Sequence, residues 1–375
     1  MPRPISITVD LNAIRHNFDY AHSLGARPKN GDSLDNVSQT MAVIKADAYG
    51  HGAVATARAL DGKATLLAVS SIEEAVSLRQ NHIKTPILLL EGCFCSSELS
   101  VLDDLNLQVV LHNQQQIEEL LNTSLDEPAD VWLKIDTGMH RLGISAADAN
   151  HTYQTLANSK NVRSIVLMTH FAMSDQPNHT FFKRQHEDFH NLVKALSTTD
   201  QLIPNSAANS AAVMSAPESH GTWNRPGIML YGISPFDHEN TFSAPLIPAM
   251  QFHSKIIALR QVNAGESVGY GATWTATQPS IIATVAAGYG DGYPRTAKSG
   301  TPVMINGQIA PLAGRVSMDM LCVDVTQLNK VKIGDDVELW GKELSVNEVA
   351  QWADTLGYEL VTRMPTRAKR VFINE

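Results

Sequence analysis

Cysteine is scarce in this sequence. The 375 residues contain only three, Cys93, Cys95 and Cys322. A set this small and scattered excludes a disulfide framework, and its spacing is not that of a zinc site. We therefore expect small buried or surface thiols, and no metal.

Long apolar runs are also absent. The run at residues 86–90 is far shorter than the roughly 20 residues of a membrane span, and it fits a buried strand better. Residues 1–10 alternate apolar and polar side chains like a strand, and they lack the charged-then-apolar build of a signal peptide. These absences favour a cytoplasmic protein that does not associate with membranes.

Basic residues are not in excess. Lys and Arg together number 29, against 38 Asp and Glu, which gives a formal net charge of −9. Because polyanions attract basic surfaces, this balance argues against nucleic acid or an anionic membrane as the main partner.

Short β-rich runs alternate with amphipathic helical stretches from about residue 41 to residue 234. Helical periods such as SIEEAVSLRQ and FFKRQHEDFHNLVKAL separate these runs. About eight strand–helix units predict a (β/α)₈ barrel, with a doubly wound open sheet as the alternative. The expected strands are MAVIKA, TLLAVS, PILLLEG, LQVVLH, DVWLKID, SIVLMTH, a short one near residues 202–204 and one entering IMLYG.

The two ends of the sequence differ from this pattern. A first helix is expected to begin at Asp10, a good N-cap residue, and the polar stretch at residues 27–40 is predicted to be a loop without a functional role. Beyond about Phe242, β-branched runs separated by turn residues predict a second domain, with one short helix, SVNEVAQWADTLG, before a final strand. The expected division is a barrel at residues 10–240 and a mostly β domain at residues 241–375, joined by an N-terminal strand at 1–9.

Functional groups of a (β/α)₈ barrel lie at the C-terminal ends of its strands. Lys45 ends an apolar strand, where desolvation favours the neutral amine that can form a Schiff base. Tyr49, Gly50 and Gly52 then predict a tight turn near a phosphate-sized space. Taken alone, such a lysine more often packs its stem and extends its charge into solvent.

Seven segments, in order, resemble the alanine racemase family. The resemblance spans nearly the whole chain. It implies a pyridoxal 5'-phosphate barrel followed by a β domain, in a homodimer whose active sites lie between subunits. It also implies an isomerase that interconverts L- and D-alanine and supplies D-alanine for peptidoglycan. The segments are IKADAYGHG, KIDTGMHRLG, HFAMSDQ, NRPGIMLYG, VGYGATW, AAGYGDGYPR and GRVSMDM.

The resemblance implies two catalytic residues. Lys45 would hold the cofactor and then act as a base, and Tyr270 would reach in from the partner subunit as the opposing base. Two bases are needed because a proton leaves one face of the substrate Cα and another arrives on the opposite face. A phenol has a pKa of about 10, so Tyr270 needs cationic neighbours to work near neutrality. Without the motif, Tyr270 would read as an ordinary strand tyrosine.

The same resemblance implies the cofactor's neighbours. His170 and Arg225 would form a hydrogen-bonded chain with that tyrosine, and Arg225 would contact the pyridine nitrogen. Because a guanidinium keeps its proton, the ring would be a weaker electron sink, which limits side reactions such as transamination. Taken alone, these residues would be a core histidine and an exposed loop arginine. Phosphate contacts are implied for Tyr49, Ser210, Gly227, Ile228 and, on a looser match, Tyr358.

Substrate contacts are implied as well. Arg141 would bind the cofactor's phenolic oxygen and the substrate carboxylate. Lys134 is carbamylated in many family members and positions that arginine; a lysine paired with Asp136 or another acid is the alternative. Residues implied in substrate access from the partner subunit are Met318, Asp319, Tyr289 and Asp291, of which the last two could also be a simple turn, and Ser317 stands where relatives often carry cysteine.

Three other activities are weighed against this one. A broad-specificity amino acid racemase would share the scaffold but have a roomier pocket. A decarboxylase of the same cofactor fold would not need Tyr270 opposite Lys45. A non-catalytic pyridoxal-phosphate carrier would need only the barrel, so the β domain argues against it.

Overall fold

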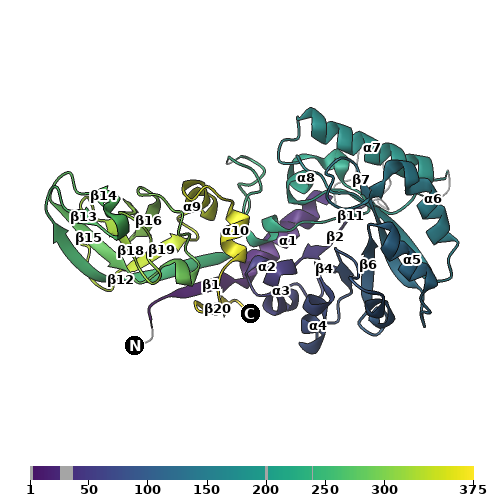
Figure 1. The fold of residues 1–375 in the computed structure, drawn as a ribbon, viewed down its shortest axis with the longest axis horizontal. Helices are drawn as coiled ribbons and strands as arrows, with labels where there is room; N and C mark the ends of the chain where they lie inside the picture. The colour runs from purple at the N-terminus through teal and green to yellow at the C-terminus, as the bar shows by residue number, and fades with distance from the viewer. Residues whose placement is uncertain (1–2, 26–36, 199–201, 239) are drawn as a thin grey trace.

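The computed structural model describes residues 3–25, 37–198, 202–238 and 240–375, and these form two lobes (Figure 1). One lobe is a ring of parallel strands with helices outside it, and the other is mostly antiparallel sheet. The predicted fold class, a (β/α)₈ barrel followed by a mostly β domain, is confirmed.

Parallel pairing closes the barrel. Strand β2 (Gln39–Thr40) runs into β3 and pairs with β11 (Trp223–Asn224). Asn209, just after β10, forms a parallel bridge with Arg225, just after β11, so the ring closes and the open-sheet alternative is wrong. The strands between are β3 (Ala42–Val43), β4 (Leu67–Val69), β5 (Ile87–Leu89), β6 (Leu107–Leu111), β7 (Ala129–Asp136), β9 (Val162–Met168) and β10 (Asn205–Ser206), with β8 (Ile144–Ser145) at the side of β7.

Helices cover the outside of the barrel. The first begins as predicted, because the Asp10 carboxylate accepts the backbone N–H groups of Asn12 and Ala13 at 3.0 and 3.4 Å. The predicted stretches SIEEAVSLRQ and FFKRQHEDFHNLVKAL are helices α4 and α7. The set is α1 (Leu11–Gly25), α3 (Ala53–Ala59), α4 (Ile72–Gln80), α5 (Gln114–Asn122), α6 (Ala146–Ala157), α7 (Thr180–Leu196) and α8 (Ser210–Ser215).

Three local predictions need correction. The last barrel strand is Trp223–Asn224, and the apolar IMLYG beyond it is a buried 3₁₀ helix, η4 (Ile228–Tyr231), since Tyr231 reaches in to donate to the Val43 carbonyl. The strand expected near residues 202–204 begins at Asn205. Residues 26–36 of the predicted loop lie outside the described part of the chain, but Gln39–Thr40 is strand β2.

The second lobe is built around one long strand, β12 (Met250–Val262). It pairs antiparallel with β1 (Ser6–Asp10), β15 (Ser280–Val285) and β19 (Asp336–Trp340). A hairpin of β13 (Ser267–Val268) and β14 (Trp274–Thr275) projects from this lobe. The remaining strands are β16 (Pro302–Ile305), β17 (Gln308–Pro311), β18 (Leu321–Asp324) and β20 (Lys369–Ile373).

Two short helices, α9 (Val346–Trp352) and α10 (Gly357–Thr362), replace the single helix predicted before the final strand. They meet at a bend because Asp354 adopts a left-handed conformation, with φ 53°. Helix α10 lies between the two lobes (Figure 1). Among the described helices, none is both long and apolar enough to cross a membrane.

Candidate active site

A cavity of about 840 Å³ lies at the C-terminal ends of the barrel strands. The structure brings together there most of the residues that the sequence singled out. Among the described residues of the second lobe, Leu356 and Tyr358 alone reach it. The predicted residues lining it are Lys45, Tyr49, Lys134, Arg141, His170, Ser210, Arg225, Gly227, Ile228 and Tyr358.

Lys45 begins a turn of unusual handedness. The four residues after it, Ala46 to Tyr49, all have positive φ, between 51° and 54°. Non-glycine residues lose roughly 1–2 kcal/mol each in this region, so local preference opposes the turn. Outside contacts stabilise it: Glu74 accepts the Ala46 N–H at 2.7 Å, and Arg370 pairs with Asp47 at 2.9 Å.

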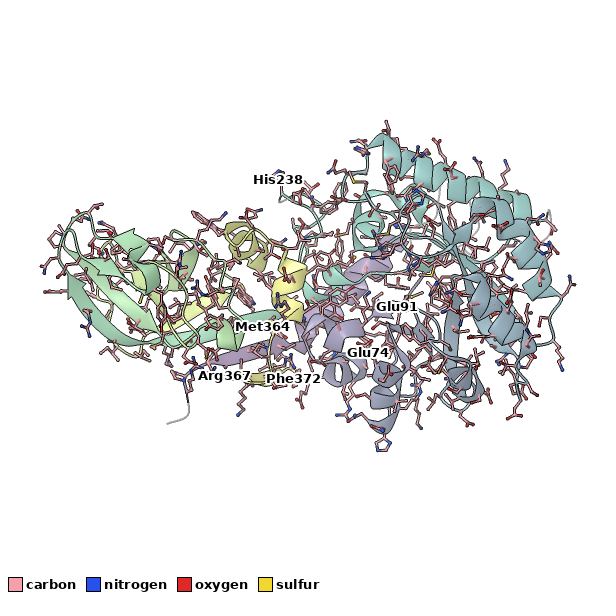
Figure 2. The ribbon with its side chains drawn as sticks, in the orientation of Figure 1. Glu74, Glu91, His238, Met364, Arg367 and Phe372 are labelled. Atoms are coloured by element: carbon pink, nitrogen blue, oxygen red, sulfur yellow. The ribbon has the colours of Figure 1, made fainter. Side chains whose placement is uncertain are left out.

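The glycines that follow permit close packing. At Gly50, φ is +79°, and a Cβ there would lie 1.9 Å from the Val361 carbonyl oxygen in α10. At Gly52, φ is +93° and a Cβ would meet the Phe372 ring at 2.7 Å. Glu74 belongs to the barrel and Phe372 to β20, so both lobes support the turn (Figure 2). The predicted tight turn is present.

Arg225 is buried and is held by several hydrogen bonds. It donates to the Ser206 hydroxyl at 2.7 Å and to the carbonyls of Thr169 and Ala207 at 2.6 and 3.1 Å. Burial lowers the pKa of Arg225 to about 9, so the guanidinium stays charged at neutral pH. These contacts fix its plane at the cavity wall, because a guanidinium donates in a rigid fork.

His170 lies beside this guanidinium, with its Nδ1 3.5 Å from an Arg225 nitrogen. Burial, and then the charge of Arg225, hold the pKa of His170 well below its usual value. The imidazole is therefore neutral.

A group of neutral donors forms one end of the cavity. Ser210 Oγ accepts the N–H of Gly227 at 2.8 Å, and a Cβ at Gly227 would lie 2.6 Å from the Tyr49 hydroxyl. Burial raises the pKa of Tyr49 to about 12 and also raises that of Tyr358, so both phenols keep their protons. Hydroxyls and N–H groups without bulk fit a phosphate, as the cofactor implied by the resemblance requires.

Lys134 belongs to a cluster of cations around the cavity. Burial, together with the charges of Arg225, Arg141 and Lys45, lowers the pKa of Lys134 to about 8. The alternative pairing with Asp136 is wrong: that carboxylate bonds to His140 at 3.1 Å. Lys134 takes part in no ion pair among the residues that the structure describes. The site thus attracts anions and holds a weakly basic amine.

The predicted partner-subunit residues lie elsewhere. Tyr270, between β13 and β14, is 68% exposed and does not line the cavity of its own chain. Met318 and Tyr289 are also exposed, at 53% and 42%. Asp291, by contrast, is completely buried, so it cannot line a substrate path itself.

Sequence reasoning missed several contributors. Thr169 and Ser206, which hold Arg225, stand at the ends of β9 and β10, where the strand-end rule could have found them. Glu91, which also lines the cavity, follows β5 in the same way. No sequence signal connects Arg370 with Asp47, because only the folded chain brings them together.

Comparisons with known proteins identify the family of the chain. The family described as "Alanine racemase, N-terminal domain" matches residues 9–235, and "Alanine racemase, C-terminal domain" matches residues 249–372. The chain is 70% identical to an alanine racemase of Pseudoalteromonas atlantica over the whole of both chains. The crystal structure of the biosynthetic alanine racemase from Pseudomonas aeruginosa superimposes with a TM-score of 0.92 at 46% identity, covering 99% of each chain. The structure of alanine racemase from Acinetobacter baumannii superimposes with a TM-score of 0.90 at 35% identity, also over 99% of each chain.

Proposed function

This chain belongs to the alanine racemase family and interconverts L- and D-alanine, and we propose that its cavity holds pyridoxal 5'-phosphate between Lys45 and the Tyr270 of a second subunit. The observation that carries the proposal is the cavity itself, where a strand-end lysine faces buried cations and neutral donors. The family uses this cofactor, and the residues present fit it.

Each end of the cofactor has its own set of residues. Lys45 would bond to its aldehyde carbon, and Arg225 would donate to the pyridine nitrogen. Ser210, the backbone of Gly227 and Ile228, and the hydroxyls of Tyr49 and Tyr358 would bind the phosphate. When bound, the cofactor withdraws electrons from the substrate Cα and so makes its proton acidic.

The two bases would come from different chains. The Lys45 amine takes or returns the proton on one face of Cα, and the Tyr270 phenol serves the opposite face. The exposure of Tyr270 supports this assignment, since a catalytic tyrosine that does not line its own cavity needs another subunit. His170 and Arg225 would form a hydrogen-bonded chain with this phenol, and the charge of Arg225 would favour its ionised form. A homodimer is therefore part of the proposal.

Substrate binding falls to Arg141 and to Met318 of the second subunit. Arg141 would hold the alanine carboxylate through its planar fork. Lys134, with a pKa of about 8, offers a neutral amine that can add CO₂ and lose a proton. The resulting carbamate anion would hold Arg141 in place.

The organisation of the chain is also part of the proposal. We propose a division near residue 240, between the two regions matched by the family models. Strand β1 joins the parts, since it pairs with β12 and then enters α1. We place the enzyme in the cytoplasm, because all three cysteines are free thiols, as a reducing compartment favours.

Deuterium exchange tests the assignment of the bases. Wild-type enzyme loaded with the cofactor should racemise L-alanine in D₂O and place deuterium at Cα. Lys45→Ala should lose the visible absorbance of the Schiff base and all activity. Tyr270→Phe should keep that absorbance and exchange the Cα hydrogen of D-alanine without inversion, because Lys45 still serves that face.

Tyr153→Phe is the matched control, since Tyr153 lies on α6 outside the cavity. It should behave as the wild type. If Tyr270→Phe racemised alanine at the wild-type rate, the two-base assignment would have to be abandoned.

A further inference from the structure

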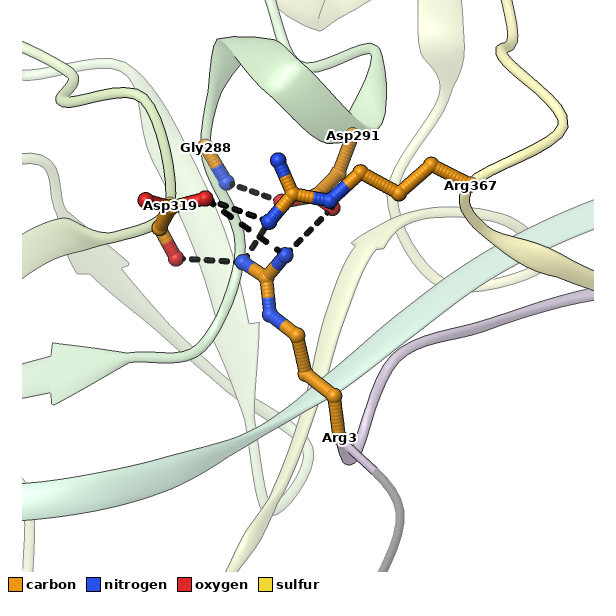
Figure 3. Close-up of polar contacts among 5 residues, drawn as sticks. All are labelled: Arg3, Gly288, Asp291, Asp319 and Arg367. Atoms are coloured by element: carbon orange, nitrogen blue, oxygen red, sulfur yellow. Dashed lines mark hydrogen bonds and ion pairs between the residues drawn. The ribbon is translucent and has the colours of Figure 1, made fainter.

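A buried carboxylate joins the two ends of the chain. Asp291 has no exposed surface, and Arg3 donates to both of its oxygens at 2.7 Å. Arg367 lies 3.2 Å from the same carboxylate, and the backbone N–H of Gly288 donates to it at 2.9 Å (Figure 3). Buried charges are stable only when paired in this way, so both arginines matter.

Asp319 completes the cluster. Its carboxylate pairs with Arg367 and lies 3.8 Å from Arg3, which also donates to its backbone carbonyl at 2.5 Å. Two arginines from opposite ends of the sequence thus hold two aspartates from two separate turns (Figure 3). Since the four charges balance, the cluster is neutral as a unit.

The two turns are also joined through their backbones. The N–H of Tyr289 donates to the Ser317 carbonyl at 3.0 Å, and that of Gly290 to the Met318 carbonyl at 2.9 Å. A Cβ at Gly288 would lie 2.3 Å from the Ser317 oxygen, so the contact leaves no space. The turns must therefore shift together, and they carry the exposed side chains of Tyr289 and Met318.

We propose that Arg3 and Arg367 are positioning residues for substrate access, which fix Met318 and Tyr289 at the mouth of the second subunit's cavity. This inference rests on the proposed shared site. Neither arginine lines the cavity of its own chain, so they act through the joined turns and not on the reacting atoms. Breaking the ion pairs of this cluster weakens the binding of alanine, but it leaves the cofactor and the two bases in place.

Steady-state kinetics of the dimeric, cofactor-loaded enzyme tests the role. Arg3→Gln should raise KM for both enantiomers by about tenfold, since small misplacements at an active site have effects of this order or larger. The kcat per bound cofactor should stay within about twofold. Arg3→Lys keeps the positive charge, so its KM should lie between the values of Arg3→Gln and the wild type. Arg367→Gln should also raise KM and leave kcat nearly unchanged.

Arg163→Gln is the matched control, because Arg163 is an exposed barrel arginine bonded to the Pro128 carbonyl. It should leave KM unchanged. Three results would overturn the inference: a normal KM in both Gln variants, a lower melting temperature with an unchanged KM, or an equal rise in KM in the control. If Arg3→Gln does not fold, Arg367→Gln and Arg3→Lys carry the test.

Failure of the proposed function is distinguishable. A wild-type enzyme that is monomeric, or that does not racemise alanine, contradicts the shared site itself. If the wild type is an active dimer and the arginine variants have the wild-type KM, only the positioning role is contradicted.

Discussion

At the scale of single residues, the cavity depends on one missing side chain. Gly227 has φ −118° and ψ −92°, a combination that residues with a side chain rarely adopt. Tyr49 adds a second reason for glycine, because its hydroxyl would lie 2.6 Å from an added Cβ. The Tyr49 hydroxyl is also proposed to bind the cofactor phosphate. Glycine at position 227 therefore leaves space for this hydrogen-bond donor.

Gly227→Ala should weaken binding of pyridoxal 5'-phosphate by about tenfold, since the new methyl group displaces the Tyr49 hydroxyl. Fluorescence titration of the apo-enzyme measures the affinity. In a Tyr49→Phe background, Gly227→Ala should reduce the affinity for the cofactor much less, because the clashing oxygen is gone. Equal losses in both backgrounds would contradict the steric explanation.

Single residues also show how far sequence reasoning reaches. Lys45, Arg141 and His170 could be located because they follow predicted strands, and barrel chemistry occurs there. The partners of Arg225 are mostly backbone carbonyls, which carry no residue-specific signal. The contact between Arg3 and Asp291 spans 288 positions, so no local pattern could predict it.

At the scale of elements, prediction succeeded where local preference and tertiary structure agree. Helices α4 and α7 have amphipathic periods that packing confirms. The turn after Lys45 is the opposite case, since four left-handed residues oppose local preference. Contacts with α10, β20 and Glu74 help to stabilise it. The glycines predicted that the chain turns here, but the left-handed conformation of the residues before them has no signal in the sequence.

His51 in this turn should make stability depend on pH. Its Nδ1 faces the Tyr49 and Ala48 carbonyls at 2.9 and 3.1 Å, and burial lowers its pKa from 6.5 to about 4. Between these values the unfolded chain binds a proton that the folded chain does not. Stability therefore falls as pH drops through this window, by about 3 kcal/mol from His51.

Urea unfolding at several pH values measures this contribution. His51→Asn, which keeps a donor for the carbonyls, should flatten the decline between pH 6.5 and about 4. The decline in stability that remains in this variant comes from other buried groups. His170 is one of them, because burial lowers its pKa as well. Exposed His238 is the control, and its Asn variant should follow the wild type (Figure 2). An unchanged slope in His51→Asn would refute the assignment.

At the scale of the whole molecule, the proposed site needs residues from two chains. Its cavity contains Lys45, whereas Tyr270 projects from the other lobe into solvent. In a dimer, the second lobe of each chain could place its Tyr270 at the cavity of the other chain, and both sites would then be complete. Sequence alone could suggest this arrangement only by resemblance, because one chain's pattern does not encode its symmetry.

Mixing two inactive variants tests this arrangement. Lys45→Ala and Tyr270→Phe subunits, unfolded together and refolded in equal amounts, should form mixed dimers with one intact site. Random pairing makes half of the dimers mixed, so activity should recover to about a quarter of the wild-type value. Refolding each variant alone should recover none. If the mixture stayed inactive while size measurements showed dimers, both bases would belong to one chain.

The pairing of β1 has a consequence for synthesis of the protein. Strand β1 is translated before the barrel, but its partners β12 and β20 are translated after it. Ile7 and Val9, fully buried in the finished sheet, have no partner strand while the barrel is made. A chain that ends shortly after the barrel would keep β1 as an unpaired, apolar strand edge. Such a chain would be a target for chaperones and proteases.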